Sequence, residues 1–506
     1  MQRALSEVSY GRRSAVKQSI AETDRFEDFD LLSVVQSSIA PQALNGLIDV
    51  SPTPIQRLAI PALLGTEDKK RRRRGPAPEK SGMEQFLLAA ETGSGKTLAY
   101  LLPVIDAIKR AEAADMEREA AETEKKKAEQ RQNLFELTSP PLSNEPHPTT
   151  GRPRAIILLP TAELVSQVGT LAKSLSHTVK FRSAMISASF SGTVIRSRLF
   201  SPNGIDVLIS TPHLLSSITE QDPNVLSRVT HMVVDEADSL FDRSFAPITG
   251  AILDRATPSL QQLILCSATI PRSLDSYLRK RFPDMRRLAT PNLHAIPRRV
   301  QLGVVDVEKD PYKGNRNLAC ADTIWNIGKE ASEDGGLESA KRMIVFVNER
   351  EKTLELAEYL RSKGIDATAL NRDVDERKQA EVLASFTGAA LPNKTDKQAK
   401  RAEADVMDRS QTGNASASLS GPPKRQLQNV KVLVMTDLGS RGIDTLLVRH
   451  VILYDVPHTS IDFIHRLGRV GRMGRRGRGV VLVGKGDRRD IVREVREGMF
   501  KGQALI

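Results

Sequence analysis

The stretch Ala90–Thr97 (AETGSGKT) has the residue types of a phosphate-binding loop. In such a loop, glycines let backbone N–H groups turn toward phosphates, a lysine neutralises the β- and γ-phosphate charge, and a threonine hydroxyl coordinates Mg²⁺. Gly93, Gly95, Lys96 and Thr97 supply these groups, while Ala90 stands where the common pattern has its first glycine. A small residue suffices there if its φ stays negative. The stretch therefore predicts a site for a nucleoside triphosphate and Mg²⁺.

A second group of residues that could take part in a reaction is the acidic pair Asp235 and Glu236 in the stretch HMVVDEADSLFD. Two carboxylates at the end of an apolar strand can divide the work of hydrolysis: one holds Mg²⁺, and the other orients and deprotonates the attacking water. The alternative is that the acids only cap a helix. Their place after a phosphate-binding loop favours hydrolysis of a nucleoside triphosphate.

Sheets are needed to position these residues. An apolar run, FLLAA, precedes the loop, and a helix-like segment, TLAYLLPVIDAIKR, follows it, so the helix N-terminus points at the anion. Apolar runs alternate with longer helical segments along the whole chain, which predicts two α/β domains with parallel sheets covered on both faces. The predicted strands are Gln85–Ala89, Arg154–Leu159, Asp206–Ile209, His231–Val234 and Gln262–Cys266 in the first domain, and Arg342–Val347, Val430–Met435, His450–Leu453 and Gly479–Val483 in the second.

The length and charge of the chain fit two domains and an acidic partner. A single core stops growing near ~250 residues, so a chain of 506 residues indicates two domains plus insertions. The formal charge of +12 and the pI near 9.6 favour nucleic acid or an anionic membrane as partner. No apolar run approaches the ~20 residues that span a bilayer, so no membrane insertion is expected. Two cysteines, Cys266 and Cys320, are too few for a disulfide framework or a zinc site.

Several segments fall outside the repeating pattern. The basic segment 1–28 begins with four Arg and Lys residues and a single acid in its first twenty positions, which fits a mitochondrial transit peptide or a disordered basic tail. The basic run 69–74 and the insertions 109–150 and 388–428 are expected to be exposed, and 109–150 should start as a charged helix. A Pro-containing linker is expected at 291–300, between domains at 29–290 and 301–506.

Ala90–Thr97 and Asp235–Asp238 (DEAD) resemble motifs I and II of the DEAD-box RNA helicases, a family in which alanine at the first loop position is usual. The resemblance implies two RecA-like domains with ATP and Mg²⁺ between them. It assigns Thr97 and Asp235 to the metal and Glu236 to the attacking water. Ser267-Ala268-Thr269 resembles motif III, which with Asp238 couples hydrolysis to RNA handling. The residues implied to bind the nucleotide are Ala90, Glu91, Thr92, Gly93, Ser94, Gly95, Lys96 and Thr97.

The stretch SPTPIQRLAIPALL is similar to the Q motif of the same family. This similarity implies that Gln56, with Thr53 beside it, reads the edge of adenine and so selects ATP. Phe29, rather than Phe26, is the upstream aromatic residue expected to stack on the base. The plain alternative for the stretch is the start of an amphipathic helix, and the presence of motif I favours the Q motif.

Two stretches of the second domain extend the resemblance. MTDLGSRGIDT is similar to motif V, which implies that Asp444 binds the ribose of ATP. HRLGRVGRMGRRGRG is similar to motif VI, which assigns His465 and Arg466 to coupling and brings Arg469 and Arg472 to the γ-phosphate from the other domain. Arginines that reach the transferring phosphoryl group in this way stabilise its transition-state charge. A nonspecific RNA-binding tail is the simpler alternative, but the spacing matches the family.

The RNA-binding motifs depart from the family pattern. Motif Ia has Ala162 in place of an arginine, and motif Ib has His213 and Leu214 at its last two positions, so the grip of the first domain on RNA phosphates should be weakened. With aromatics at 4% of the chain, tracking of the RNA backbone is favoured over base stacking. The residues that the resemblance places against RNA are Pro160, Thr161, Thr211, Pro212, Arg441 and Gly442.

Taken together, these resemblances predict an ATP-dependent RNA helicase. The stretches PHLL and PTAELV, the first-domain insertion and the segment TPNLHAIPRRVQLGVVDVEKDPYKGNRNLACADTIWNIGK resemble a fungal mitochondrial subgroup of DEAD-box helicases tied to mitochondrial RNA metabolism and large-ribosomal-subunit assembly. That subgroup implies a location in the mitochondrial matrix, mitochondrial ribosomal or messenger RNA as partner, and a monomer that works with ribosomal assembly proteins. The alternatives are an ATP-gated RNA clamp with little unwinding, a binding module without catalysis, and a DNA substrate in place of RNA.

Overall fold

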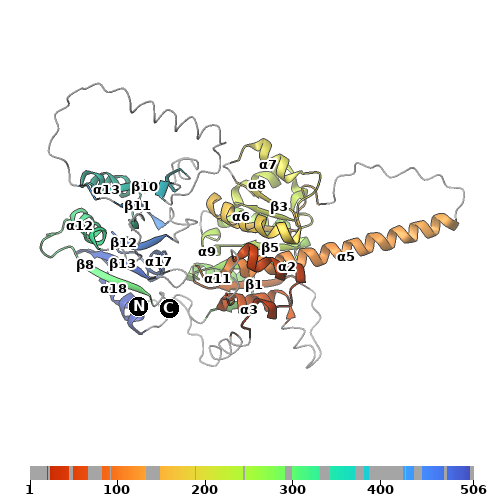
Figure 1. Cartoon of the computed structure of the whole chain (residues 1–506), viewed down its shortest axis with the longest axis horizontal. Coiled ribbons are helices and arrows are strands. Elements are labelled where there is room, and N and C mark those ends of the chain that lie inside the picture. Colours follow the sequence, from red (N-terminus) through yellow and green to blue (C-terminus); the bar gives the residue numbers. More distant parts are fainter. Residues whose placement is uncertain are drawn as a thin grey trace, which may run out of the picture. The chain divides into compact units, whose positions relative to one another are not determined.

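The computed structural model describes residues 20, 23–44, 50–66, 82–91, 93–132, 149–187, 190–242, 245–290, 299–330, 341–370, 381–383, 385–386, 426–427, 429–437, 447–471 and 476–501. The chain divides into two compact units, residues 1–295 and 296–505, and each unit is built on one parallel sheet (Figure 1). Two parallel sheets confirm the predicted fold class.

The first unit contains a seven-stranded sheet in which every pair of neighbouring strands is parallel. The order is β3 (Ser183–Ile186), β4 (Val207–Ser210), β2 (Ala155–Leu158), β5 (His231–Val234), β6 (Gln262–Ser267), β1 (Glu84–Ala89) and β7 (Arg286–Ala289). Strands β1, β5 and β6 lie at the centre, so the carboxyl ends that carry the loop and the acidic pair meet at one edge of the sheet.

Both faces of this sheet are buried. Along β1, Phe86 and Leu88 point into one core, and Leu87 and Ala89 point into the other, as the two-residue period of a strand requires. The first core is covered by α2 (Ser33–Ser38), η2 (Ile39–Ala43), α3 (Pro54–Leu63), α5 (Lys96–Gln132) and α6 (Ala162–Val179). The second is covered by α7 (Gly192–Leu199), α8 (Pro212–Gln221), η3 (Pro223–Leu226), α9 (Ala237–Leu240), α10 (Ala246–Ala256) and α11 (Arg272–Arg281). The short helices η1 (Phe26–Asp28) and η4 (Thr257–Ser259) complete the described elements of this unit.

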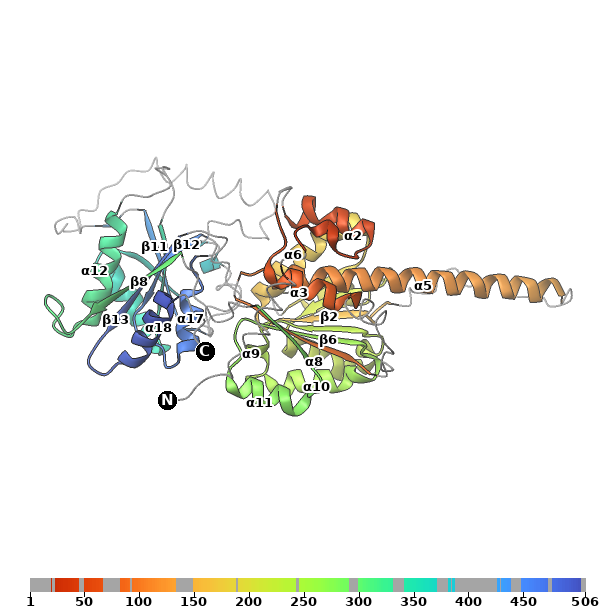
Figure 2. The ribbon, with the colours of Figure 1, turned by 90° about the horizontal axis from the view of Figure 1, so that it is seen from below.

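Helix α5 is far longer than the sheet that it covers. Its first turns are buried, but from Met116 to Lys125 every residue is exposed, and the orange helix extends well beyond the first unit in both views (Figures 1 and 2). This exposed half carries the charged sequence of the insertion 109–150 and pairs Arg118 with Asp115 on its own surface. The insertion therefore starts as an extension of a core helix.

The second unit contains a six-stranded sheet, again with parallel neighbours throughout. The order is β10 (Asp366–Leu370), β11 (Val430–Met435), β9 (Lys341–Phe346), β12 (Val448–Leu453), β13 (Gly477–Val483) and β8 (Val300–Asp306). One face packs against α17 (Ser460–Leu467) and α18 (Arg489–Lys501), and the other against α12 (Arg316–Lys329) and α13 (Glu351–Ser362).

Each strand predicted from the sequence is present within a few residues of its expected bounds. The strands that were not predicted are β3, β7, β8 and β10, and these are the four edge strands of the two sheets. The basic run 69–74, the segment 291–298 and most of 388–428 lie outside the described residues, as do most of residues 1–28. Both cysteines are buried free thiols. In the described ranges, no helix has the length and apolarity of a membrane span.

Candidate nucleotide and RNA site

The phosphate loop joins β1 to the first turn of α5. Ala90 directly follows the strand with a negative φ, and its N–H donates to the carbonyl of Ser267 at 3.2 Å, so no glycine is needed there. Gly93 and Gly95 have φ of 76° and 84°, which L side chains rarely adopt. The buried Lys96 donates from Nζ to the carbonyls of Ala90 and Glu91 at 2.8 and 3.0 Å. The lysine is therefore held over the loop by the loop's own backbone.

Gln56 connects the predicted Q motif to this loop. Its side chain is 3% exposed, and Nε2 donates to the carbonyl of Gly95 at 3.1 Å, while Oε1 accepts from the N–H of Thr53 at 2.9 Å. A Cβ added to Gly95 would lie 2.6 Å from Nε2 of Gln56. The structure thus brings Thr53 and Gln56 against the loop, and their reading of the adenine edge stays a prediction.

Phe29 lies upstream in a different setting. It is 5% exposed and packs edge-on against Phe26, with ring centroids 6.0 Å apart, inside the core that also holds α2 and α3. The nearby backbone is fixed by Asp106 of α5, which accepts from the N–H of Leu32 at 2.7 Å. Both candidate aromatics therefore serve the core, and stacking of Phe29 on a base remains a prediction.

The acidic pair follows β5 beside α5. Tyr100, one turn after Lys96, donates from its hydroxyl to Oδ2 of Asp235 at 3.1 Å. Burial raises the pKa of Asp235 to about 6, the Glu236 carboxylate adds to the rise, and Lys96 and Tyr100 oppose it. Asp235 is thus a desolvated carboxylate next to a cation.

Glu236 occupies the left-handed region at φ 52° and ψ 51°, and its N–H donates to Oδ1 of Asp235 at 2.9 Å. This conformation turns the chain sharply between β5 and α9. Glu91 of the loop is also buried enough for its pKa to rise, and it accepts a hydrogen bond from Thr290 at 3.4 Å.

The residues present fit Mg²⁺ bound together with a nucleotide. The described residues contain no cluster of three or more His, Cys, Asp or Glu side chains. Mg²⁺ that is held with phosphates needs only one or two carboxylates, because phosphates and water supply the other ligands. A buried carboxylate at Asp235 and a hydroxyl at Thr97, the second residue of α5, meet that requirement.

A chain of hydrogen bonds connects Asp235–Asp238, the DEAD segment, to Ser267–Thr269, the SAT segment. Thr269 donates from Oγ1 to Oδ2 of Asp238 at 2.7 Å, and Ser267 donates from Oγ to the carbonyl of Thr269 at 2.6 Å. Because Ser267 also accepts from the N–H of Ala90, the phosphate loop, the DEAD segment and the SAT segment are linked by direct contacts. Ala268, between the two hydroxyls, is 4% exposed.

The residues predicted to contact RNA in the first unit stand at helix starts. Thr161 caps α6, with Oγ1 accepting from the N–H of Leu164 at 3.3 Å, and Thr211 precedes α8, whose first residue is Pro212. Pro160 directly precedes Thr161 and is buried. The altered positions offer no cation. Ala162 opens α6, the exposed His213 packs its ring 5.1 Å from that of Phe245, and Leu214 packs against the second core.

In the second unit, the best-defined residue of motif VI is Arg466, which is 2% exposed. It donates to both carboxylate oxygens of Asp437 at 2.7 Å, to Oδ1 of Asn348 at 2.7 Å and to the carbonyl of Asp455 at 3.1 Å. Asp455 in turn accepts from Arg316 at 2.8 Å. Arg466 therefore ties the segments after β9, β11 and β12 together.

The remaining predicted residues of the second unit divide into two groups. His465 is in α17, and Arg469, 9% exposed, follows its end. Arg441, Gly442, Asp444 and Arg472, and also Thr92 of the phosphate loop, lie outside the described residues. The sequence reasoning did not identify Tyr100, Asn348, Asp437 or Asp455. Asp437 stands inside the stretch MTDLGSRGIDT, and Asn348 inside VFVNERE, which resembles a further helicase motif, so both could have been suspected. Tyr100 and Asp455 have no local signal.

Comparison with known proteins identifies the class that this fold and site define. The family model described as DEAD/DEAH box helicase matches residues 53–277, and that of the helicase conserved C-terminal domain matches residues 421–474. A structure of S. cerevisiae Dbp5 bound to RNA and ADP BeF3 aligns with a TM-score of 0.61 at 19% identity over 94% of this chain and 93% of that one. Mss116 bound to ssRNA and UDP-BeF gives 0.62 at 18% identity over 99% and 79%. At these identities the match shows a shared fold.

Relatives that match over the whole of this chain are much closer to it in sequence. The ATP-dependent RNA helicase mrh4, mitochondrial, of Sclerotinia sclerotiorum is 64% identical over 100% of this chain and 82% of its own length. The proteins of the same name from Aspergillus fumigatus and Neurospora crassa are 60% and 57% identical, again over the whole of this chain and 82% and 81% of theirs. The chain therefore belongs to the DEAD-box family of ATP-dependent RNA helicases and, within it, to this fungal mitochondrial group.

Proposed function

We propose that the protein couples ATP binding and hydrolysis to the binding and local unwinding of RNA in the mitochondrial matrix, in RNA metabolism and large-ribosomal-subunit assembly. The observation that supports this best is the chain of contacts from Gln56 through the phosphate loop to Thr269 and Asp238. Coupling requires contacts between the nucleotide loop and the segments that act on RNA, and we assign Ser267–Thr269 and Asp238 to that connection.

The roles of the residues follow from their chemistry. Lys96 neutralises the β- and γ-phosphates, and Gln56 with Thr53 selects adenine. Thr97 and Asp235 hold Mg²⁺, which offsets the charge that develops on the phosphates. Glu236, beside Asp235, orients and deprotonates the attacking water. Arg469 and Arg472 of the second unit contribute the arginines that stabilise the transition state, and Asp444 holds the ribose.

The RNA contacts of the proposed helicase come from both units. Pro160, Thr161, Thr211 and Pro212 offer hydroxyls and helix-start amides to phosphates, and Arg441 and Gly442 contribute from the second unit. The protein acts as a monomer on mitochondrial ribosomal or messenger RNA, together with ribosomal assembly proteins. Without cationic side chains at Ala162 and Leu214, its RNA affinity should depend less steeply on salt than a full set of motifs would give.

The experiment is RNA-stimulated ATP hydrolysis by the full chain and by Glu236→Gln. Loss of the base should lower the rate by a factor on the order of 10²–10⁴. Glu220→Gln, an exposed glutamate on α8, is the matched control and should hydrolyse ATP at the wild-type rate. Equal rates for wild type and Glu236→Gln would exclude the proposed catalytic role.

A second candidate is an ATP-gated RNA clamp that binds without unwinding. The altered motif Ib favours it, because His213 packs on Phe245 and Leu214 packs on the core, and neither offers an arginine to RNA phosphates. Displacement of one strand from a short RNA duplex separates the two functions. Displacement that requires ATP supports the helicase, whereas ATP-dependent RNA retention with no displacement supports the clamp.

A further inference from the structure

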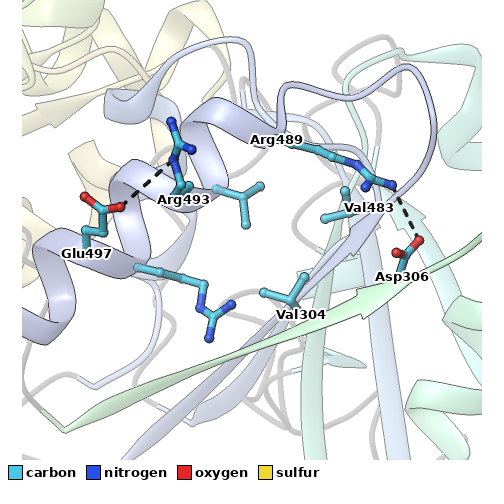
Figure 3. Close-up of a pocket in the computed structure, with 8 residues that line it drawn as sticks. Val304, Asp306, Val483, Arg489, Arg493 and Glu497 are labelled. Atoms are coloured by element: carbon cyan, nitrogen blue, oxygen red, sulfur yellow. Dashed lines mark ion pairs between the residues drawn. The ribbon is translucent and has the colours of Figure 1, made fainter.

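The second unit has a groove of about 480 Å³ between β8 and α18. The groove shares no residue with motif V, motif VI or the Arg466 network. Its apolar lining is Val304 of β8, Val483 of β13 and Val492 of α18, and Val304 is 39% exposed. In Figure 3, the side chains of Val304 and Val483 lie between two ion pairs at opposite ends of the groove.

Arginines from α18 line the groove. Arg489, Arg493 and Arg496 follow one another at four- and three-residue spacing, so they share one face of the helix, while Ile491 and Val495 point into the core. The ion pairs within the groove are loose. Arg489 lies 3.6 Å from Asp306, and Arg493 lies 4.0 Å from Glu497 (Figure 3).

These arginines are available to a ligand. The side chains of Arg489 and Arg493 are 56% and 76% exposed, so their pairs with Asp306 and Glu497 contribute little to stability. A carboxylate that enters the groove can replace such a partner at small cost, and two hydrogen bonds to one guanidinium would hold it in a defined orientation.

Strand β8 supplies a second recognition element. Among the described strands it pairs with β13 alone and forms one edge of the sheet. An edge strand has a row of backbone N–H and C=O groups that an extended polypeptide can pair with. On the side toward α18, the exposed Val304 and the half-buried Asp306 alternate with residues of the opposite face.

We propose that this groove binds an extended acidic segment of a partner protein, which adds as a strand to the free edge of β8 and places its carboxylates against Arg489, Arg493 and Arg496. An added strand directs every second side chain toward α18, so the segment should alternate acidic and aliphatic residues. Charge complementarity with the arginines and contact with the valine floor then act together.

RNA fits the same groove less well. A phosphate backbone needs an uninterrupted cationic surface, but Asp306 and Glu497 stand in the lining, and Asp490 and Glu494 follow on α18. The valine floor offers nothing to phosphate, and a nucleic acid cannot continue the hydrogen-bond ladder of β8. The observations therefore favour a polypeptide.

The test measures binding of fluorescein-labelled peptides to the full chain. The probes are a short peptide that alternates glutamate and valine, the matching peptide of lysine and valine, and a labelled single-stranded oligouridine. Arg489→Glu/Arg493→Glu should weaken glutamate–valine binding at least about tenfold, because two attractive charges become repulsive. Arg118→Glu/Arg279→Glu, with side chains 74% and 64% exposed on the first unit, is the matched control and should bind as the wild type does.

Hydrogen exchange identifies the mode of binding. Strand addition should slow exchange of the amides of Val300–Asp306, while basal ATP hydrolysis by the charge-reversed variant stays within about twofold of wild type. The proposal is overturned if the glutamate–valine peptide does not bind or if the lysine–valine peptide binds equally well. It is also overturned if Arg489→Glu/Arg493→Glu binds the glutamate–valine peptide as tightly as the wild type does. Exchange in β8 that is unaffected, or displacement of the peptide by oligouridine, would also overturn it.

Discussion

Tyr100 donates a hydrogen bond to Asp235 over 3.1 Å, and neither side chain is open to solvent. Tyr100 lies four residues after Lys96, so one turn of α5 presents a cation and a hydroxyl donor to the same buried carboxylate. Burial raises the pKa of the Tyr100 hydroxyl well above its usual range, and the Asp235 carboxylate adds to the rise. The hydroxyl therefore stays protonated and fixes the orientation of Asp235.

Tyr100→Phe should raise the Mg²⁺ concentration needed for half-maximal ATP hydrolysis. A hydrogen bond to a charged group is worth about 1.5–3 kcal/mol. Without the bond from Tyr100, Asp235 can more easily rotate away from the metal. Mg²⁺ titrations of the ATPase measure the change. Tyr277→Phe is the control, because its hydroxyl accepts a hydrogen bond from Arg281 on α11, remote in sequence from the loop. An unchanged Mg²⁺ requirement would contradict the orienting role.

Asp235→Asn should stabilise the protein at neutral pH when nucleotide and Mg²⁺ are absent. The folded-state pKa of about 6 lies above the ordinary value of 3.8, so the folded protein holds the proton of Asp235 more tightly than the unfolded chain does. The resulting contribution to the free energy of unfolding is complete below pH 4 and is lost as the pH rises through 6. The free energy of unfolding of Asp235→Asn relative to wild type should therefore increase from pH 4 to pH 7 by on the order of 1–3 kcal/mol.

Urea unfolding at a series of pH values measures that difference. His231 acts in the opposite sense, because burial lowers its pKa from 6.5 to about 4. The stability that its neutral ring contributes is lost as the pH falls from about 6.5 toward 4. Since His231 is present in both proteins, its effect cancels in the comparison. A difference that stays constant from pH 4 to pH 7 would show that Asp235 ionises normally.

Gly95→Ala should weaken ATP binding by at least about tenfold. Its φ of 84° costs a non-glycine residue on the order of 1–2 kcal/mol, and the new Cβ would push Nε2 of Gln56 off the Gly95 carbonyl. Binding of a fluorescent ATP analogue gives the dissociation constant. Gly65→Ala is matched in φ, at 68°, but meets no atom within 4 Å, so it should destabilise the fold without weakening nucleotide binding.

Arg466→Lys should destabilise the second unit by about 3 kcal/mol. A lysine cannot span both oxygens of Asp437 and also reach Asn348 and the carbonyl of Asp455, and it leaves buried polar groups unpaired. Chemical unfolding of the full chain, followed by hydrogen exchange in β9 and β12, measures the loss. Arg488→Lys, which is exposed and pairs with Asp490, is the control. Equal protection in both variants would rule out a structural role for the Arg466 network.

The core of each sheet could be predicted from sequence, and its edges could not. Central strands such as β5 and β11 are buried on both faces and appear as continuous apolar runs. The edge strands include SAMI, RRLA and DATAL, in which half-buried or exposed positions carry Ser, Arg, Asp and Thr. Their pattern is that of a loop, because their strand conformation depends on a neighbour far away in the sequence.

The same distinction holds within the site. Lys96 belongs to a short stretch whose residue types and spacing indicated a nucleotide site, and Gln56 belongs to a stretch that resembles the Q motif. The two meet at Gly95, which precedes Lys96 and accepts a hydrogen bond from Gln56. Tyr100 sits among apolar residues of α5, so its sequence context is that of a core aromatic. Its role depends on Asp235, 135 positions later, and only the sheet brings the two together.

With Glu236 as the proposed base, its left-handed backbone means that catalysis and folding compete at one position. Glutamate at φ 52° costs the folded state about 1 kcal/mol that glycine would not. Glu236→Gly should therefore unfold at higher urea than Glu236→Ala, which keeps the strained backbone, although both lack the base. If the alanine variant proves the more stable of the two, the backbone is not strained. Selection for thermal tolerance alone would drive this position toward glycine, so a carboxylate there fits the role in hydrolysis proposed for Glu236.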